Sequence, residues 1–171
     1  MSDSLQTYVN RFVRDRERLQ RTLPEALLLY EPKLGQPSLT PAEDEEYVVR
    51  TQTSINPMLS QPSGPMVFVV EKTHRNAFGR GITVGRAVNN DIVIDDGSVS
   101  RFHAWFEKSP EGTFLVADAG SKNGTTLKNA KLEPRKTAAV STSEMICFGK
   151  VEVTFFSAEG FLEMLARAAP A

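Results

Sequence analysis

Three short segments hold the polar side chains that could bind an anion, and apolar runs of strand length separate them. The segments are Gly85-Arg86, Ser100-Arg101 and Lys122-Asn123-Gly124. If the corresponding turns meet at one end of a β-structure, their cations and small donors converge. Arginine donates two parallel hydrogen bonds to a phosphate and keeps its proton at any physiological pH. The spacing therefore predicts a site for a phosphorylated side chain, and such binding requires no catalytic group.

The order of these motifs resembles the forkhead-associated domain family. The longer matches are Ile92-Val93-Ile94-Asp95, Ser100-Arg101-Phe102-His103-Ala104 and Ser121-Lys122-Asn123-Gly124-Thr125. The resemblance covers about residues 66–157, roughly half of the chain. It implies an all-β sandwich of about 10–11 short strands, an architecture that many short apolar runs at this spacing also favour. It further implies that the protein binds phosphothreonine in partner proteins.

The resemblance gives five side chains a place in the binding site. Arg86 would bind the phosphate, Ser100 would donate its hydroxyl to a phosphate oxygen, and Arg101 would add a second cation. Lys122 lies where the family has a side chain that reaches the phosphate or the peptide. Asn123 matches the family's asparagine, which bonds the main chain of the bound peptide and so fixes its register. A phosphothreonine offers three acceptor oxygens and more than one negative charge to these donors.

Three further residues would support the binding loops. Gly85 would let the backbone turn sharply before the arginine, and Gly124 would supply a positive φ in the third turn. His103 matches a family histidine that braces the binding loop and does not touch phosphate. Asn89 and Asn90 are predicted to set local turn geometry.

The two main contacts have simpler alternatives. Arg86 could form a surface ion pair with Asp91 or Asp95, and the Ser100 hydroxyl could bond its own backbone. The complete set of motifs favours the phosphate site over both alternatives. A catalytic pair of Ser100 and His103 is disfavoured, because no G-x-S-x-G turn is present. The protein is therefore predicted not to be an enzyme.

No metal or cofactor is predicted. The chain has one cysteine and two histidines, and His74 and His103 are too far apart in sequence to give a metal-ligand spacing. Cys147 lies in an apolar run and is predicted to be a small core residue. A single cysteine allows no disulfide within the chain, which fits a reducing compartment.

The composition is ordinary for a soluble globular protein, with 24% charged and 40% apolar residues in a chain of 171. A net charge of −1 gives no support for a nucleic-acid partner. No apolar run approaches the length of a membrane span, and the N-terminus lacks the apolar core of a signal peptide. The predicted location is therefore the cytoplasm.

The distribution of proline, charge and apolar periodicity predicts four segments. They are an N-terminal helical segment (1–31), a Pro-rich acidic linker (32–65), the forkhead-associated domain (66–157) and a C-terminal helix (158–171). A first helix is predicted from about Ser4 to Arg21. The sequence Thr22-Leu23-Pro24-Glu25 predicts a second helix that ends near Tyr30. Within the linker, Tyr47–Thr51 could pair as an edge strand.

The predicted helices carry apolar stripes that must be buried. The N-terminal stripe consists of Leu5, Val9, Phe12, Val13 and Leu19, and the C-terminal stripe of Phe161, Leu162, Leu165 and Ala168. The first could pack on the sandwich, on a second copy of the chain or on a different protein. Four arginines lie mostly off it: Arg11, Arg14, Arg18 and Arg21. They form either a solvated face or a docking surface for a partner protein or an anionic membrane. The C-terminal helix is predicted to pack on the sandwich or the N-terminal helices, with partner binding as the alternative.

The predicted function is phosphothreonine-dependent protein–protein interaction, in the role of an adaptor or regulator in Ser/Thr kinase signalling. The partner would be a phosphothreonine-containing protein, either a Ser/Thr kinase or a kinase substrate. The alternative is a non-catalytic scaffold that oligomerises or docks through its helices, with a lapsed or self-occupied phosphate site. Self-occupation would require phosphorylation of the linker, where the candidate residues are Thr40, Thr51, Thr53 and Ser54.

Overall fold

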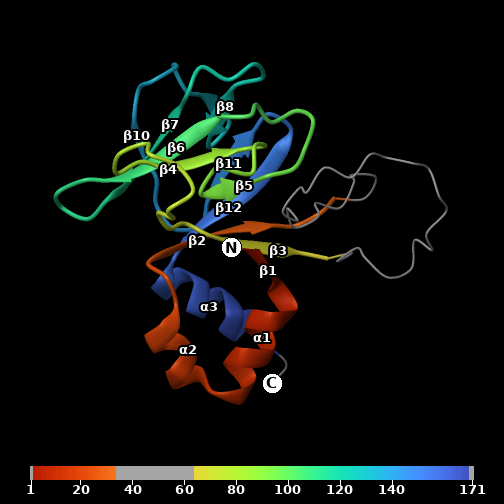
Figure 1. Ribbon diagram of the computed structural model, residues 1–171. Helices are drawn as coiled ribbons and strands as arrows, with labels where there is room; N and C mark the ends of the chain where they lie inside the picture. The colour runs from red at the N-terminus through yellow and green to blue at the C-terminus, as the bar shows by residue number, and fades with distance from the viewer. Residues whose placement is uncertain (1, 34–63, 170–171) are drawn as a thin grey trace.

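Two β-sheets packed face to face make up most of the computed structural model, which describes residues 2–33 and 64–169 (Figure 1). The seven-stranded sheet has the order β1-β3-β2-β12-β11-β8-β9, and its pairings are antiparallel. Its strands are β1 Ser2–Ser4, β2 Ala26–Tyr30, β3 Met66–Val69, β8 Thr125–Leu127, β9 Ala130–Lys131, β11 Glu144–Phe148 and β12 Val151–Ser157. The five-stranded sheet has the order β10-β7-β6-β4-β5, with β4 and β5 parallel. Its strands are β4 Ile82–Gly85, β5 Ile92–Val93, β6 Ala104–Lys108, β7 Phe114–Asp118 and β10 Ala138–Ala139.

The core between the sheets comes from residues that alternate along the strands. On β6, Ala104 and Phe106 are fully buried, whereas Trp105 and Glu107, on the other face, are half-buried. The ring of Phe106 stacks on that of Phe155 of β12, with 6.0 Å between the centroids. The period of two in the sequence thus directs one side of β6 into the core and the other side outward.

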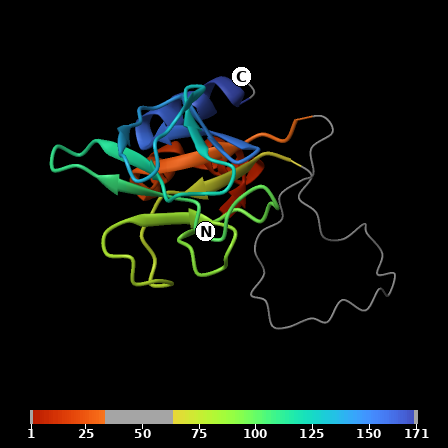
Figure 2. The same cartoon turned by 90° about the horizontal axis from the view of Figure 1, so that it is seen from above.

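Three helices cover the outer face of the seven-stranded sheet. They are α1 Leu5–Arg14, α2 Arg16–Thr22 and α3 Ala158–Ala168. A second apolar cluster joins them to the sheet and includes Leu27 of β2, Phe156 of β12 and Phe161 of α3. The ring of Tyr8 meets that of Phe161 edge-on at 5.3 Å, so α1 and α3 also contact each other. In both views, α3 lies on the opposite side of the sandwich from the loops of residues 70–102 (Figure 1, Figure 2).

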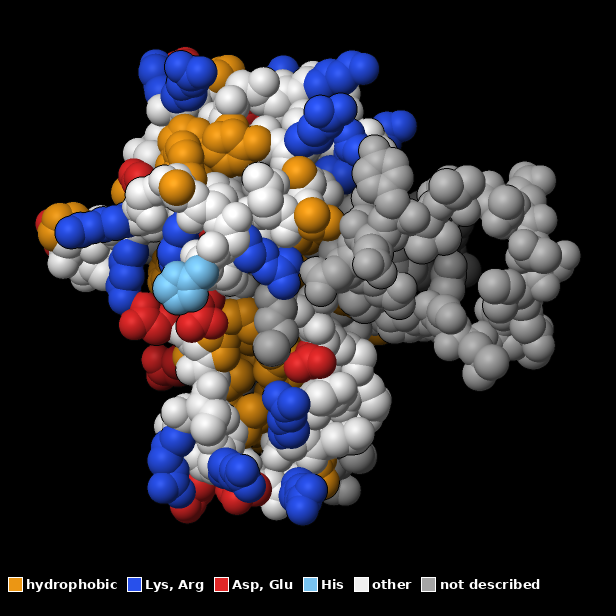
Figure 3. Space-filling model, viewed as in Figure 1, with side chains coloured by type: hydrophobic (Ala, Val, Ile, Leu, Met, Phe, Trp, Pro, Cys, Tyr) orange, Lys and Arg blue, Asp and Glu red, His pale blue; other side chains and the backbone are white. Residues whose placement is uncertain are grey.

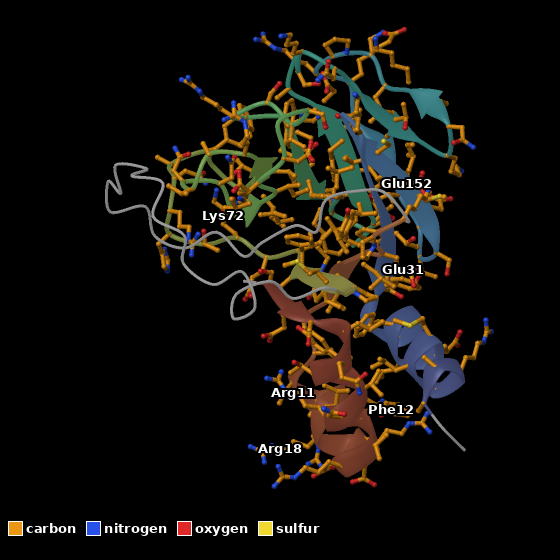
Figure 4. The ribbon with its side chains drawn as sticks, turned by 90° about the vertical axis from the view of Figure 1, so that its right-hand side faces the viewer. Arg11, Phe12, Arg18, Glu31, Lys72 and Glu152 are labelled. Atoms are coloured by element: carbon orange, nitrogen blue, oxygen red, sulfur yellow. The ribbon has the colours of Figure 1, made fainter. Side chains whose placement is uncertain are left out.

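The N-terminal apolar stripe packs on the sandwich, which was the first of its three predicted alternatives. The members that belong to the second apolar cluster or pack against it are Leu5, Val9, Phe12 and Leu19. Val13 is the exception, because 64% of its surface is exposed. Figure 4 shows Phe12 between α1 and α3, whereas Arg11 and Arg18 point outward.

Polar side chains set the ends of the helices. The helix predicted from Ser4 to Arg21 is interrupted at Asp15, which ends α1 and caps α2 by accepting the backbone N–H of Arg18 at 2.9 Å. An aspartate competes with the helix for backbone donors, which explains the break. The predicted C-terminal helix is confirmed as α3, and the Ser157 hydroxyl caps it by accepting the N–H of Gly160 at 3.1 Å.

The second helix predicted from Thr22 to Tyr30 is wrong. Ala26–Tyr30 forms strand β2, which is hydrogen-bonded between β3 and β12. All five of its residues are buried, because one face of the strand lies in the core and the other lies beneath the helices. A short run that is apolar at every position suits a strand buried on both faces better than an amphipathic helix. The helical segment predicted for residues 1–31 therefore ends in a strand of the sandwich.

The short apolar runs between residues 66 and 157 form strands as predicted, with ends shifted by at most one residue. The sequence-based prediction missed the short strands β1 and β9 in addition to β2. A tight turn connects β8 to β9. Lys128 and Asn129 have φ values of 50° and 65°, as a two-residue hairpin turn requires.

Several predictions concern the linker, and they lie outside the described residues. They are the edge strand Tyr47–Thr51 and the phosphorylation of Thr40, Thr51, Thr53 or Ser54. The division of the chain into four segments also stays a prediction. None of the described helices combines the length and the apolar character that crossing a membrane demands.

Candidate phosphate-binding site

Three loops meet at one end of the sandwich. We call residues 86–91 the first loop, residues 95–103 the second loop and residues 119–124 the third loop. The first two are joined by backbone hydrogen bonds, because the N–H of Arg86 donates to the carbonyl of Ser100 at 3.0 Å and that of Ala87 to the carbonyl of Arg101 at 3.2 Å. The side-chain amide of Asn90 donates to the same Arg101 carbonyl at 2.6 Å. Asn90 thus holds the first loop to the second as well as shaping its own turn.

The third loop is joined to the second by two hydrogen bonds. The backbone N–H of Lys122 donates to the hydroxyl oxygen of Ser100 at 3.0 Å. The side-chain amide of Asn123 donates to the carbonyl of Ser98 at 2.8 Å. The structure therefore brings together the segments that carry all five predicted binding residues: Arg86, Ser100, Arg101, Lys122 and Asn123.

The guanidinium of Arg86 is exposed, and one of its nitrogens holds it in place. Its Nε–H donates to the carbonyl of Val99 at 3.1 Å. Among residues 2–33 and 64–169 it forms no ion pair, so the alternative of a pair with Asp91 or Asp95 is not found there. The bond from Nε orients the plane of the group, and the two terminal amino groups remain able to bind an anion.

Ser100 is hydrogen-bonded to this arginine through the backbone, and its side-chain hydroxyl keeps its own proton free. Its oxygen accepts from the third loop, and within the described part of the chain the hydroxyl donates to no acceptor. The side chains of Arg101 and Lys122 are exposed and likewise form no ion pair in that part of the chain. Two cationic side chains and one hydroxyl donor thus accompany the guanidinium of Arg86 on the joined loops.

The buried imidazole of His103 links the second loop to the third. Its Nδ1 accepts the backbone N–H of Ser100 at 3.0 Å, so the proton lies on Nε2, which donates to the carbonyl of Gly124 at 2.9 Å. Burial lowers the pKa of His103, and the bond to Gly124 and the charge of Asp118 oppose that shift. This is the geometry that the predicted bracing role requires. It also prevents the ring from acting as a base toward the Ser100 hydroxyl, because a backbone donor occupies Nδ1.

Glycine is required at Gly85 and at Gly124 for different structural reasons. A Cβ at Gly85 would lie 2.2 Å from the carbonyl oxygen of Arg101, so the second loop can approach β4 this closely only at a glycine. The predicted sharp turn at Gly85 is therefore replaced by a close backbone approach at the end of a strand. Gly124 has the positive φ that was predicted, at 81°.

Two buried carboxylates that the sequence-based prediction missed hold the loops in shape. Asp118, the last residue of β7, accepts hydrogen bonds from the hydroxyls of Ser121 and Thr125 and from the backbone N–H groups of Ser121 and Gly120, at 2.5–3.0 Å, and so holds the third loop. Burial would raise the pKa of Asp118, but these bonds outweigh it and lower the pKa. An aspartate at the end of a predicted strand, just before a Gly-Ser turn, was the available signal.

Asp91 is the second buried carboxylate, and it holds the first loop in shape by accepting hydrogen bonds. Burial would raise its pKa, but hydrogen bonds from Thr73, Thr83 and Lys72 bring the pKa to about 2. The backbone N–H groups of Thr73 and Thr83 donate to it at 2.9 Å and 2.8 Å, and the ammonium of Lys72 lies 3.0 Å away. No sequence signal pointed to this role of the carboxylate, because Lys72 and Thr73 come from a segment without a recognisable pattern.

The thiol and the other potential metal ligands show no reactive arrangement in the described residues. Cys147 is half-buried, its thiol donates to the carbonyl of Gly149 at 3.2 Å, and burial raises its pKa. Across residues 2–33 and 64–169, no three His, Cys, Asp or Glu side chains come together in a way that could hold a metal ion.

Comparison with known proteins agrees with this architecture. A family model described as FHA domain matches residues 82–149. The oxoglutarate dehydrogenase inhibitor of Corynebacterium efficiens is 38% identical over 102 residues, which are 56% of this chain and 68% of that protein. The glycogen accumulation regulator GarA of Mycolicibacterium smegmatis is 33% identical over 113 residues, which are 63% of this chain and 68% of that protein. The sandwich, its three joined loops and these matches define the class, and the chain belongs to the forkhead-associated (FHA) domain family.

Among solved structures, the chain is similar to the FHA domain of the CT664 protein from Chlamydia trachomatis. The two are 20% identical, and the superposition covers 77% of this chain and 97% of that chain with a TM-score of 0.49.

Proposed function

We propose that this protein binds phosphothreonine segments of other proteins and acts as a non-catalytic adaptor or regulator in Ser/Thr kinase signalling. The observation that carries the proposal is the pairing of Arg86 and Ser100. The backbone joins these residues at 3.0 Å, and both have donor groups without a partner among the described residues. Membership of the FHA family supports the same role.

The phosphate would be held by donors that need no rearrangement. A phosphothreonine has roughly −1.5 to −2 charges and three acceptor oxygens. The terminal amino groups of Arg86 would bind two of the oxygens, and the hydroxyl of Ser100 would donate to one of them. Arg101 and Lys122 would add positive charge at the rim. Because hydrogen bonds already fix the loops, they would lose little conformational freedom on binding.

Asn123 would fix the register of the bound segment. One of its amide N–H groups is used by the second loop, which holds the side chain in place. Its other N–H and its carbonyl oxygen have no partner in the described part of the chain. An amide with one free donor and one free acceptor can pair with the main chain of an extended peptide.

The partner class follows from the same chemistry. We propose a phosphothreonine-containing protein, either a Ser/Thr kinase or a kinase substrate, in the cytoplasm. The relatives are named an inhibitor and a regulator, which supports a role in controlling other proteins. The scaffold alternative finds less support, because most of the N-terminal apolar stripe is already covered by the sandwich.

The first prediction is that Arg86→Ala strongly weakens phosphopeptide binding. A phosphothreonine-peptide library would supply a ligand, and titration calorimetry would measure its affinity. Removal of a bidentate, charge-assisted contact is expected to weaken binding by about 100-fold. The matched control is Arg14→Ala, which removes an exposed arginine of α1 on the helical side of the molecule and should leave the affinity unchanged.

Two results would contradict the proposal. One is an affinity that Arg86→Ala does not change, and the other is equal binding of the dephosphorylated peptide. A library in which no phosphothreonine peptide binds would favour the scaffold.

A further inference from the structure

Ser98, in the second loop, makes hydrogen bonds through its hydroxyl, its N–H and its carbonyl. The hydroxyl donates to Oδ1 of Asp96 at 2.6 Å, and the backbone N–H donates to the same oxygen at 2.8 Å. The hydroxyl oxygen also accepts the backbone N–H of Lys150 at 2.9 Å. The carbonyl accepts the side-chain amide of Asn123 at 2.8 Å. Ser98 therefore joins its own loop to the turn between β11 and β12 and to the third loop.

The turn between β11 and β12, Gly149-Lys150, lies against the second and the third loop at once. Besides the bond from Lys150 to Ser98, the N–H of Gly149 donates to the carbonyl of Gly124 at 3.0 Å. A Cβ at Gly149 would lie 2.3 Å from the carbonyl oxygen of Ser98, so the turn can approach this closely only at a glycine. The turn thus fixes both loops relative to the seven-stranded sheet, to which β11 and β12 belong.

The carbonyl of Ser98 sets the direction of the Asn123 amide. It takes one N–H of that amide, so the remaining N–H and the carbonyl oxygen of Asn123 are held in fixed directions. Figure 3 shows Lys and Arg side chains gathered at the upper right of the molecule, on the side where the loops meet. Charge attracts an anion over a distance, whereas a neutral amide binds a peptide group only when the hydrogen bonds are aligned. The contribution of Asn123 therefore depends on Ser98 more strongly than that of the cations does.

We propose that Ser98 is a positioning residue for the bound phosphothreonine segment, and that it acts by holding Asn123 in the orientation that pairs with the main chain of the peptide. The inference rests on the proposed function. The β11–β12 turn is then a fourth part of the site, because it holds the hydroxyl of Ser98. Removal of that hydroxyl deletes its bonds to Asp96 and from Lys150 and leaves Arg86 and Ser100 unaltered.

The test measures the affinity of the best phosphothreonine peptide from the library by titration calorimetry. Ser98→Ala should weaken binding by about tenfold, the loss expected when one well-aligned hydrogen bond is no longer made. Ser98→Thr keeps the hydroxyl and should restore most of the affinity. The matched control is Ser109→Ala, because the hydroxyl of Ser109 also accepts a backbone N–H, at 3.1 Å from Thr113, but lies in the turn at the far end of β6.

A double-mutant cycle tests whether Ser98 acts through Asn123. Asn123→Ala should weaken binding by about tenfold, and adding Ser98→Ala to it should weaken binding by less than a further twofold or so. A general loosening of the loops would instead weaken both chains by the same factor, because it would also disturb the contacts of Arg86 and Ser100. If urea unfolding shows that Ser98→Ala fails to fold, Asp96→Ala takes its place in the cycle, since it removes the acceptor of the Ser98 hydroxyl.

The outcomes separate this proposal from the proposed function. If Arg86-dependent binding is found but Ser98→Ala weakens the native and the Asn123→Ala chains equally, or weakens neither, the positioning proposal is overturned and the proposed function stands. Native affinity of the Asn123→Ala chain would overturn it as well, and so would a Ser98→Thr chain that binds as weakly as Ser98→Ala. If no phosphothreonine peptide binds, both proposals fail together.

Discussion

His103 connects the acid–base chemistry of one residue to the shape of the whole site. Its neutral ring accepts from the second loop and donates to the third. Protonation of Nδ1 would replace an acceptor with a donor and break the bond from Ser100. The position of the Ser100 hydroxyl therefore depends on a ring that never touches the ligand in the proposed complex.

Stability is predicted to fall on mild acidification. The folded pKa of His103 is lowered, whereas the unfolded chain has a pKa of about 6.5, so below that pH the unfolded state binds a proton that the folded state does not. The contribution is fully present above about pH 6.5 and is lost as the pH falls through the folded pKa. Urea unfolding between about pH 7.5 and pH 5.5 measures it, and His103→Gln should flatten the profile.

The chain contains its own control for this experiment, because it has one other histidine. His74 is exposed, so His74→Gln should leave the pH dependence unchanged. A profile that His74→Gln flattens instead would contradict the assignment to His103.

Asp91 is predicted to be a strong determinant of stability. Asp91→Asn should lower the free energy of unfolding by about 2–4 kcal/mol at neutral pH, because it leaves the partly buried Lys72 without its counter-charge. The pKa of Asp91, about 2, lies below the ordinary value of 3.8. The stabilisation by its carboxylate is therefore present above pH 3.8 and is lost as the pH falls toward 2. Asp95→Asn, at an exposed neighbour, should change stability by less than about 0.5 kcal/mol. Equal effects of the two changes in urea unfolding would contradict the prediction.

The residues of the proposed phosphate site could be picked out from sequence, whereas most of the residues that support their loops could not. Arg86, Ser100 and Asn123 stand in short contiguous motifs, so their order alone indicated a common site. Asp91 is held by Lys72 and residues on other segments, and such long-range pairs leave no local pattern in one sequence.

At the scale of elements, periodicity located strands well and failed where both faces of an element are buried. The strands of residues 66–157 alternate or are bounded by turns, and their positions were predicted. Strand β2 is apolar throughout, and its capping-like Thr22 and Pro24 favoured a helix locally. Packing between two sheet neighbours and beneath the helices overrides that local preference.

Substitutions on β2 test this assignment. Leu27 contributes to the cluster beneath the helices and Leu28 to the core between the sheets, and both are fully buried. Leu27→Ala and Leu28→Ala should each lower the free energy of unfolding by about 2–5 kcal/mol. Val13→Ala, at an exposed position of α1, should cost less than about 0.5 kcal/mol. If Leu27 and Leu28 lay on a helix with one buried face, one of the two substitutions would lower stability strongly and the other weakly. Urea unfolding of the three variants therefore distinguishes a buried strand from such a helix.

At the scale of the whole molecule, the loops of the proposed phosphate site and the three helices lie on different sides of the sandwich. The joined loops lie at one end of the sandwich, and the three helices cover the outer face of the seven-stranded sheet (Figure 1). The family match covers residues 82–149, yet the seven-stranded sheet also needs β2, β3 and β12 from outside that range. A boundary drawn at residue 66 from composition therefore separates strands that are hydrogen-bonded to each other.

The place of β2 also bears on how the protein is made. Leu28 leaves the ribosome long before its partner on one side, Phe155 of β12. Until then one edge of β2 has no strand beside it, and its apolar side chains lack the neighbours that α3 and β12 provide. The sheet cannot close until β12 has been synthesised, so the nascent chain must keep this segment from aggregating until then.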